Sequence, residues 1–167
     1  MNRVLVLGPC GSGKSTLARA LGERTGLPVI HLDKERFGPG WVDPDDETWS
    51  RRVESLAARP SWVMDGNYSD TLHFRLPRAD TAIVLDFPTA LCFWRVLKRV
   101  AINYGRTRFD MAEGCREHLS FEFLWFVLRF RANRWPASLA ALRGFDGTKV
   151  FLNSPADVRS YLETFEK

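Results

Sequence analysis

Short apolar runs alternate with longer amphipathic stretches along the 167 residues of this chain. Most of the apolar runs are rich in β-branched or bulky side chains, which is typical of strands buried on both faces of a parallel sheet. The predicted strands are residues 4–7, 29–32, 62–64, 81–85 and 150–152. Because helix-like stretches separate these runs, we expect helices to connect successive strands.

The helix-like stretches share helical spacing of apolar residues or flanking helix signals. They lie at residues 14–24, 44–58 and 88–104, on each side of Trp135-Pro136, and after Pro155. The second is expected to begin with Asp43 as its N-cap and Pro44 in its first turn. Such alternation predicts an α/β fold in which helices cover both faces of a five-stranded parallel sheet. Ligands of this kind of sheet bind at the carboxyl ends of the strands.

The predicted helix at residues 88–104 has one apolar face and one basic face. The apolar positions are Phe93, Val96, Leu97, Val100 and Tyr104, and the basic positions are Arg95, Lys98 and Arg99. We therefore expect the first set to pack against the protein and the second set to be available to anionic groups.

Composition indicates a single domain over residues 1–167. Apolar residues make up 45% of the chain, enough for a substantial core, and there is no internal repeat, low-complexity tract or Gly/Ser-rich linker. The formal charge of +4 favours anionic partners such as nucleotides, phosphorylated metabolites or nucleic acid. Charge alone does not separate these three classes.

Neither a membrane nor an oxidising compartment is expected. No segment reaches the roughly 20 apolar residues that a membrane-spanning helix needs, and no secretory leader precedes the first predicted strand. The cysteines, Cys10, Cys92 and Cys115, lie far apart without a C-x-x-C pair. We therefore expect a cytoplasmic protein without a zinc site or a disulfide framework.

A phosphate-binding loop directly follows the first predicted strand. The motif G-x-x-x-x-G-K-[ST] is formed by Gly8, Pro9, Cys10, Gly11, Ser12, Gly13, Lys14 and Ser15, with Thr16 next in the helix. Its glycines let backbone N–H groups point at phosphate oxygens, and the start of the helix adds its positive dipole end. Lys14 is placed to reach the β- and γ-phosphates, and Ser15 offers its hydroxyl to Mg²⁺. The motif predicts that ATP and Mg²⁺ bind here.

Cys10 lies inside this loop, beside a predicted helix N-terminus. That position is expected to lower the pKa of the thiol and so permit redox control. The alternative is a side chain that simply points away from the bound nucleotide.

Three aspartates stand at or just beyond the ends of predicted strands: Asp33, Asp65 and Asp86. A carboxylate at this edge can bind Mg²⁺ or accept a proton from an acceptor hydroxyl. Aspartates at strand ends also cap turns and helices, and Asp86, which precedes Phe87-Pro88, fits that role best.

Residues 95–134 form a basic, lid-like segment. The arginines placed to stabilise phosphate charge are Arg95, Arg99, Arg106, Arg108, Arg129 and Arg134. The alternatives are a solvated helix face and a nucleic-acid surface in which Tyr104, Phe109, Trp125 and Trp135 contact bases. Because most of these aromatic residues have core-like spacing, we expect them in the core and the arginines at phosphate.

Residues 34–60 form an insert between the second and third predicted strands. Its aromatic residues, Phe37, Trp41 and Trp49, either stack on an aromatic acceptor or pack together as a small cluster. His31, beside Asp33, either orients a substrate or has a structural role.

Several stretches together resemble a known family. Residues 4–16, 31–33, 62–68, 79–88 and 110–115 look like those of adenylate-kinase-like P-loop proteins that are labelled DNA topology modulation proteins. The resemblance spans nearly the whole chain. It implies a three-layer P-loop NTPase fold with a helical lid over residues 95–134 and an insert over residues 34–60 that binds the phosphoryl acceptor.

The resemblance also implies roles for two carboxylates. Asp65, in Met64-Asp65-Gly66, corresponds to the Mg²⁺-binding aspartate of adenylate kinases, and Asp33 remains for the acceptor. The chain departs from adenylate kinases at residues 67–69, which replace the aromatic-Pro-Arg element that grips AMP, and the four-cysteine lid is absent. AMP is therefore not the expected acceptor.

The sequence thus predicts an ATP-dependent phosphotransferase acting on a small acceptor such as a nucleoside or nucleotide. Lys14 and Asp33 are the predicted catalytic residues, assisted by Arg95, Arg99, Arg129 and Arg134. Arg106 and Arg108 are assigned to the nucleotide, and Ser15 and Asp65 to Mg²⁺. The alternatives are a nucleotide-dependent DNA-binding regulator and a P-loop switch, although the guanine-reading motif N-K-x-D is absent.

Overall fold

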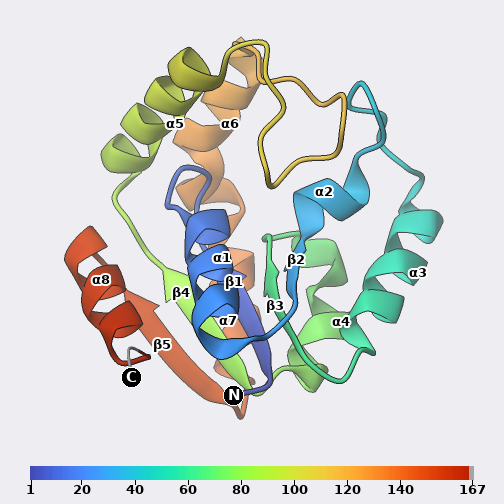
Figure 1. Cartoon of the computed structure of the whole chain (residues 1–167), viewed down its shortest axis with the longest axis vertical. Helices are drawn as coiled ribbons and strands as arrows, with labels where there is room; N and C mark the ends of the chain where they lie inside the picture. Colours follow the sequence, from blue (N-terminus) through green and yellow to red (C-terminus); the bar gives the residue numbers. More distant parts are fainter. Residues whose placement is uncertain (166–167) are drawn as a thin grey trace.

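A five-stranded parallel sheet forms the centre of the protein, for which a computed structural model describes residues 1–165 (Figure 1). The strand order is β2-β3-β1-β4-β5, and all neighbouring strands run parallel. The strands are β1 (Arg3–Leu7), β2 (Val29–His31), β3 (Trp62–Asp65), β4 (Thr81–Leu85) and β5 (Thr148–Leu152). The predicted fold class is confirmed.

The central strand, β1, shows why these runs are almost wholly apolar. Consecutive side chains of a strand point to opposite faces of the sheet. Val4 and Val6 enter the core on one face, and Leu5 and Leu7 enter the core on the other. Since both faces are covered, neither set of positions tolerates polar residues.

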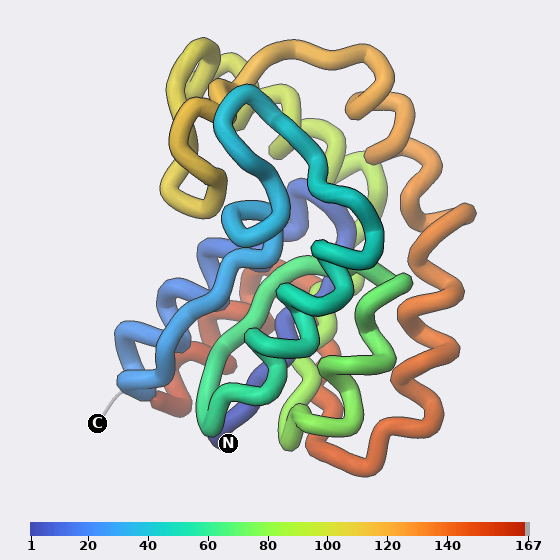
Figure 2. The backbone as a smooth tube through the Cα atoms, turned by 90° about the vertical axis from the view of Figure 1, so that its right-hand side faces the viewer, coloured from blue at the N-terminus to red at the C-terminus, as the bar shows by residue number. Residues whose placement is uncertain are grey.

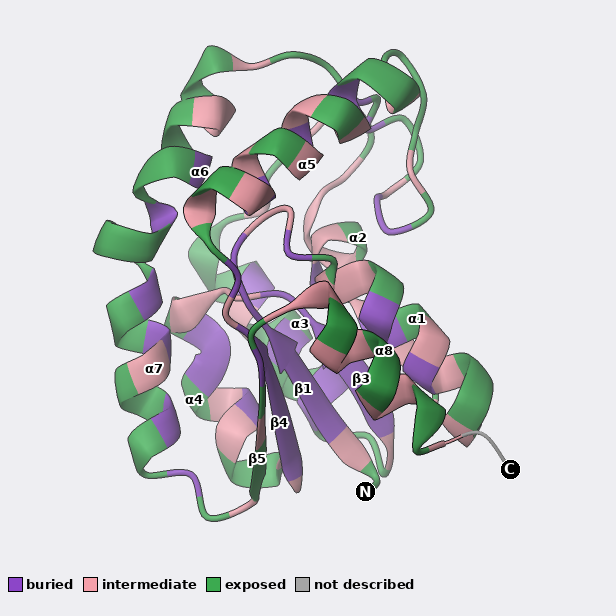
Figure 3. Ribbon diagram, turned by 90° about the vertical axis from the view of Figure 1, so that its left-hand side faces the viewer, coloured by how far each residue is buried: buried purple, intermediate pink, exposed green. Residues whose placement is uncertain are grey.

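Helices cover the two faces, giving the three layers expected from the sequence (Figure 3). One face is covered by α1 (Lys14–Thr25) and α8 (Pro155–Glu163), which pack against the valine side of β1. The other is covered by α3 (Asp46–Ala57), α4 (Leu72–Arg75) and α7 (Trp135–Arg143). Both cores lie directly below the strand ends that carry the phosphate-binding loop.

Two longer helices rise above the carboxyl ends of the strands (Figure 1). They are α5 (Thr89–Asn103) and α6 (Phe121–Asn133), which pack together through Val96, Val100 and Val127. Residues 104–120, here called the lid loop, connect them. The lid loop approaches the chain that follows β2 (Figure 2), and the Cys115 thiol donates to the Gly38 carbonyl at 3.2 Å.

Four short helical segments escaped sequence analysis because each has about one turn, too short for an apolar period to show. They are α2 (Leu32–Arg36), η1 (Ser69–Thr71), α4 and η2 (Leu76–Arg78). Leu32 begins α2, so the second strand ends at His31. This places Asp33 in a helical first turn rather than on an extended strand end.

The predicted caps of two helices are wrong. α3 begins at Asp46 because the Asp45 side chain accepts from the Thr48 amide at 2.8 Å, so Asp43 is not its cap. Asp86 does not cap α5. It accepts from Arg131, at 2.8 Å, and from the Trp135 indole, at 3.1 Å, and therefore ties the end of β4 to α6 and α7.

Within residues 1–165, no helix combines the length and the apolar character required to cross a membrane.

Candidate functional site

The loop after β1 is shaped to receive an anion. Gly11 has φ 85°, and a Cβ added there would lie 2.3 Å from the carbonyl oxygen of Cys92, so a side chain is excluded. Gly13 has φ 97° and no atom within 4 Å of its missing Cβ, so this part of the loop faces open space. α1 begins immediately after Gly13 without a side-chain cap. Its first N–H groups are therefore available to phosphate.

Lys14 and Ser12 add polar groups to this loop. The Lys14 ammonium donates to the Pro9 carbonyl at 3.0 Å, which folds its side chain back over the loop. The Ser12 hydroxyl is buried and has no hydrogen-bond partner among the described residues. A buried hydroxyl without a partner is unfavourable, and a phosphate oxygen is a ligand that would satisfy it.

Asp33 and Tyr68 meet across the ends of β2 and β3. The Tyr68 hydroxyl donates to Asp33 Oδ1 at 2.6 Å. Burial raises the pKa of Asp33, and the charge of Asp65 adds to this effect, although the bond from Tyr68 opposes it. A carboxylate with a raised pKa is a better proton acceptor than an exposed aspartate.

His31 and Asp65 form a second pair at the same edge. His31 lies opposite Asp65 in the β2–β3 register, and its Nδ1 lies 2.6 Å from Asp65 Oδ1. Burial lowers the pKa of His31, but the hydrogen bond and charge of Asp65 outweigh burial, so the pKa is raised. One oxygen of Asp65 is therefore already used by an imidazole.

A single cavity of about 1200 Å³ connects the phosphate-binding loop with these two pairs. Of the predicted site residues, those that line it are Cys10, Gly11, Ser12, Gly13, Lys14, Ser15, Thr16, Asp33, Asp65, Arg95, Arg99, Arg108 and Arg134. The structure thus brings the loop, both carboxylates and four arginines to one space.

Four predicted site residues lie elsewhere. The Gly8 amide donates to the Asn67 side chain at 3.0 Å, and the Asn67 amide returns a bond to the Gly8 carbonyl at 2.7 Å, so Gly8 and the adjoining Pro9 support the loop from behind. Arg106 is exposed on the lid loop. Arg129 stacks over the Trp125 ring at 4.4 Å on the outer side of α6.

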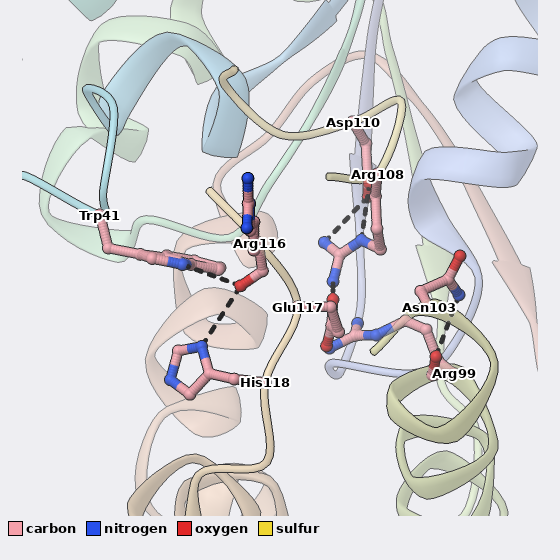
Figure 4. Close-up of polar contacts among 8 residues, drawn as sticks. All are labelled: Trp41, Arg99, Asn103, Arg108, Asp110, Arg116, Glu117 and His118. Carbon is pink, nitrogen blue, oxygen red and sulfur yellow. Dashed lines mark hydrogen bonds and ion pairs between the residues drawn. The ribbon is translucent and has the colours of Figure 1, made fainter. Parts of the chain in front are cut away.

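The arginines of the lid do not all point freely at the phosphate loop. Arg95 donates to the Ser12 carbonyl at 3.2 Å, directly at the loop. Arg99 and Arg108 both donate to Glu117, the first at 3.0 Å (Figure 4). Arg108 also donates to Asp110 through Nε at 2.9 Å. Carboxylates inside the lid therefore hold two of the predicted phosphate ligands.

Asp110 is one of the carboxylates that sequence reasoning left without a role. It is 7% exposed and lines the cavity together with Ser15. Burial raises the pKa of Asp110, but the hydrogen bonds and charge of Arg108 outweigh burial and hold that pKa below its ordinary value. The only signal in the sequence was an acidic residue within a basic segment.

The aromatic residues of the insert divide between core and cavity. Trp49 is buried and packs against Tyr68, with ring centroids 5.0 Å apart. Phe37 and Trp41 line the cavity with their centroids 5.3 Å apart. The Trp41 indole donates to the Arg116 carbonyl at 3.1 Å, which joins the insert to the lid loop (Figure 4).

Three of the four lid aromatics are not in the core, contrary to the prediction. Tyr104 is 67% exposed, Trp125 is 57% exposed and Phe109 is 47% exposed, whereas Trp135 is 2% exposed. Helical spacing identified an apolar face, but α5 and α6 stand at the rim of the molecule, where no further layer covers their outer sides. Phe109 lies edge-on to the His31 ring, with centroids 5.5 Å apart.

The expected low pKa of Cys10 is wrong. Burial raises the pKa of this thiol, and Lys14 opposes the effect only in part. Cys10 packs against the α5–α6 contact, so its surroundings are largely apolar. Its thiol is therefore protonated and unreactive at neutral pH.

Arg75 holds the segment between Asp65 and η1. Its guanidinium is fully buried and donates to the carbonyls of Gly66, Asn67 and Tyr68 at 2.9, 2.6 and 2.8 Å. No carboxylate faces it among the described residues, and burial lowers the pKa of Arg75 to about 9. This residue positions Tyr68 and Asn67 without reaching the cavity.

Replacing Arg75 by methionine is expected to destabilise the protein. The carbonyls of Gly66, Asn67 and Tyr68 would each lose a donor, and such a loss at a buried group costs about 1–3 kcal/mol. Urea unfolding should show a free energy of unfolding lower by at least that amount. Arg78→Met, at an exposed position of η2, is the matched control and should unfold like the wild type. Equal stability of the two variants would show that Arg75 does not hold this segment.

The fold and the loop together define a class. A parallel sheet of order β2-β3-β1-β4-β5 with a phosphate-binding loop between the central strand and α1 is a P-loop NTPase fold of the kinase type. The family model described as AAA domain matches residues 4–116. The chain belongs to this family.

Solved structures with the same fold cover nearly the whole chain. Shikimate kinase from Bacteroides thetaiotaomicron is 18% identical, with a TM-score of 0.59 over 98% of this chain and 95% of that one. Shikimate kinase from Acinetobacter baumannii, in complex with shikimate, is 17% identical, with a TM-score of 0.62 over 98% and 90%. A gluconokinase from Sinorhizobium meliloti 1021 is 19% identical, with a TM-score of 0.56 over 98% and 94%. Comparison with curated proteins finds no match.

The donor groups of the cavity fit a magnesium nucleotide. Within residues 1–165, no three His, Cys, Asp or Glu side chains are grouped so as to hold a metal by themselves. Mg²⁺ at phosphate-transfer sites needs only one or two protein groups, because phosphate oxygens and water complete its coordination. The Ser15 hydroxyl and the nearby carboxylates meet that requirement.

Proposed function

We propose that this protein is an ATP-dependent phosphotransferase that transfers the γ-phosphoryl group to a hydroxyl of a small acceptor. The observation that carries the proposal is the shared cavity, which joins a phosphate-binding loop to a half-buried carboxylate, Asp33, that has a raised pKa. The names of the similar structures, shikimate kinase and gluconokinase, support a kinase acting on a small molecule.

In the proposed reaction, Asp33 accepts the acceptor proton. The Tyr68 hydroxyl occupies Asp33 Oδ1 and leaves Oδ2 for the acceptor hydroxyl. The acceptor oxygen forms a bond to the γ-phosphorus as the bond to the bridging oxygen breaks, and ADP leaves with that electron pair. Asp33 thus combines two tasks, since it orients the acceptor and takes up its proton.

Cations on both sides of the cavity stabilise the transferred group. Lys14 reaches the β- and γ-phosphates, and Arg95, Arg99, Arg108 and Arg134 neutralise the charge that spreads over the γ-phosphate oxygens. Arg106 and Arg129, which lie outside the cavity, have no place in this role in the described arrangement. Ser15 and Asp65 are the proposed protein groups that would hold Mg²⁺, which would supply further positive charge toward the phosphate oxygens.

The acceptor proposed here is a nucleoside, nucleotide or similar aromatic compound with a free hydroxyl. Phe37, Trp41 and Tyr68 line the acceptor side of the cavity, where planar rings favour a planar ligand.

The cysteines within the described residues are free, which supports the proposed cytoplasmic location.

The test is ADP release from Mg-ATP by the purified protein across nucleosides, nucleotides and small phosphorylatable alcohols. Acceptor-stimulated release that is lost in Lys14→Ala would support the proposal and identify the acceptor class. Tight ATP binding without stimulation by any acceptor would overturn it.

A second candidate function is nucleotide-dependent DNA binding, as in the DNA topology modulation group. One observation favours it: Tyr104, Phe109 and Trp125 are exposed on the basic lid, where aromatic side chains are available to stack on bases. The pairing of Arg99 and Arg108 with Glu117 argues against it, because paired arginines offer less charge to a phosphate backbone. DNA binding that weakens steeply with salt would support this candidate, and its absence at low salt would dismiss it.

A further inference from the structure

Two acidic residues of the lid loop are buried and line the cavity that contains the phosphate-binding loop. Asp110 is 7% exposed and Glu117 is 5% exposed. Burying a carboxylate is unfavourable unless polar or charged partners replace its contacts with water. Within the lid loop, the Gly105 amide donates to the Glu117 carbonyl at 2.8 Å. This hydrogen bond holds the two ends of the loop together.

Glu117 and Arg108 hold Asp110 in place. Arg108 donates to Asp110 through two nitrogens, at 2.9 and 3.3 Å, and to Glu117 through the third. Figure 4 shows this guanidinium lying between the two carboxylates. Arg99 contacts the other oxygen of Glu117 at 3.0 Å. Asp110 is thus fixed by a guanidinium that is itself fixed from the other side.

Asp110 lines the same cavity as Ser15, the residue proposed to contact Mg²⁺, and the Ser15 hydroxyl helps to lower the pKa of Asp110. Asp65 and Asp33 also line this cavity, and each has one oxygen engaged, Asp65 Oδ1 with His31 and Asp33 Oδ1 with Tyr68, both at 2.6 Å. The neighbouring Phe109 packs on His31 and beneath Arg19, so the lid loop is seated on this edge of the sheet.

We propose that Asp110 joins Ser15 and Asp65 in the Mg²⁺-nucleotide site, so that the lid loop itself supplies a carboxylate toward the metal. This inference rests on the proposed nucleotide binding and adds a residue outside the phosphate loop and the strand ends. Because this carboxylate belongs to the lid loop, a nucleotide with bound Mg²⁺ would stabilise the lid loop in its present position. A nucleotide without the metal would instead be repelled by the negative charge of Asp110.

The test compares nucleotide affinity with and without metal. Dissociation constants for a nonhydrolysable ATP analogue are measured by calorimetry in excess MgCl₂ and in excess EDTA. The wild type is expected to bind the Mg²⁺ form more tightly, and Asp110→Asn is expected to lose about 10-fold of that preference, as is typical when a group around a metal is removed. Affinity in EDTA should stay equal or increase, because a negative charge is removed.

Asp146→Asn is the matched control, because Asp146 is exposed and precedes β5 at the opposite end of the sheet. It should keep the wild-type preference. If Asp110→Asn also keeps it, Asp110 has no part in the metal site although the protein binds nucleotide. If the wild type binds no nucleotide in either buffer, the proposed function fails as well, so the two failures are distinguishable.

A measurement on the wild type covers the case in which Asp110→Asn does not fold. Hydrogen exchange of residues 104–120 is followed with the Mg²⁺ analogue, with the analogue in EDTA, and without ligand. Slower exchange with the Mg²⁺ form alone is the expected result. Equal protection by the Mg²⁺ and metal-free forms would overturn the inference.

Discussion

Replacing Lys14 by alanine is expected to reduce phosphoryl transfer by about 10³-fold, as is typical for loss of a group aimed at developing charge. Among the described residues, the only hydrogen bond of the ammonium is to the Pro9 carbonyl, at 3.0 Å, and its side chain lines the cavity. Its removal therefore takes a cation from the nucleotide without taking a contact from the core. Acceptor-dependent ADP release, with thermal unfolding beside it, measures both effects.

Lys34→Ala is the control for loss of a positive charge near the cavity, since Lys34 is an exposed residue of α2. It should transfer phosphate at the wild-type rate. A Lys14→Ala protein that unfolds at a lower temperature would attribute the loss to folding. A Lys14→Ala protein that is folded and fully active would show that the phosphate-binding loop has no part in the mechanism.

Replacing Asp33 by asparagine is expected to lower turnover by about 10²–10⁴-fold, the usual contribution of a general base. Nucleotide affinity should change little, because Asp33 lies on the acceptor side with Tyr68. Asparagine keeps the oxygen that accepts from Tyr68 but does not take up the acceptor proton. Turnover and nucleotide affinity are measured separately, by ADP release and by calorimetry.

The activity that depends on Asp33 is expected to fall at low pH. Burial raises the pKa of Asp33, and the base works only when deprotonated, so kcat/KM falls as the pH is lowered through this raised pKa. The acid limb should lie at higher pH than an exposed aspartate would give, and it should be absent from Asp33→Asn. A variant with normal turnover, or with the same acid limb, would show that another group accepts the proton.

Stability gives an independent check on the same residue. A carboxyl whose pKa is raised by folding contributes stability below its unfolded pKa, and this contribution is lost as pH rises through the folded pKa. At neutral pH the charge on the half-buried Asp33 therefore lowers the stability of the folded protein. Asp33→Asn should unfold at an equal or higher temperature, which separates its loss of turnover from any loss of structure. Asp70→Asn, an exposed carboxyl that lines the same cavity, should match the wild type in both measurements.

Local patterns in the sequence determined much of this protein. The apolar strands and the loop at residues 8–15 were predicted correctly, because a buried parallel strand requires a continuous apolar run and a phosphate loop requires glycine at fixed spacing. The order of elements then predicted the fold, since parallel strands joined by helices have few arrangements. These patterns involve residues that are close in the sequence, so they can be recognised without knowledge of the folded structure.

Only the tertiary structure decided which side chains meet. His31 pairs with Asp65 because β2 and β3 are neighbours in register, and Asp110 shares a cavity with Ser15 because Phe109 of the lid loop packs on His31 at the strand ends. Tyr104 and Trp125 are exposed although their spacing is that of core residues. Spacing determines which face of a helix is apolar, but whether another layer covers that face depends on where the helix stands in the folded molecule.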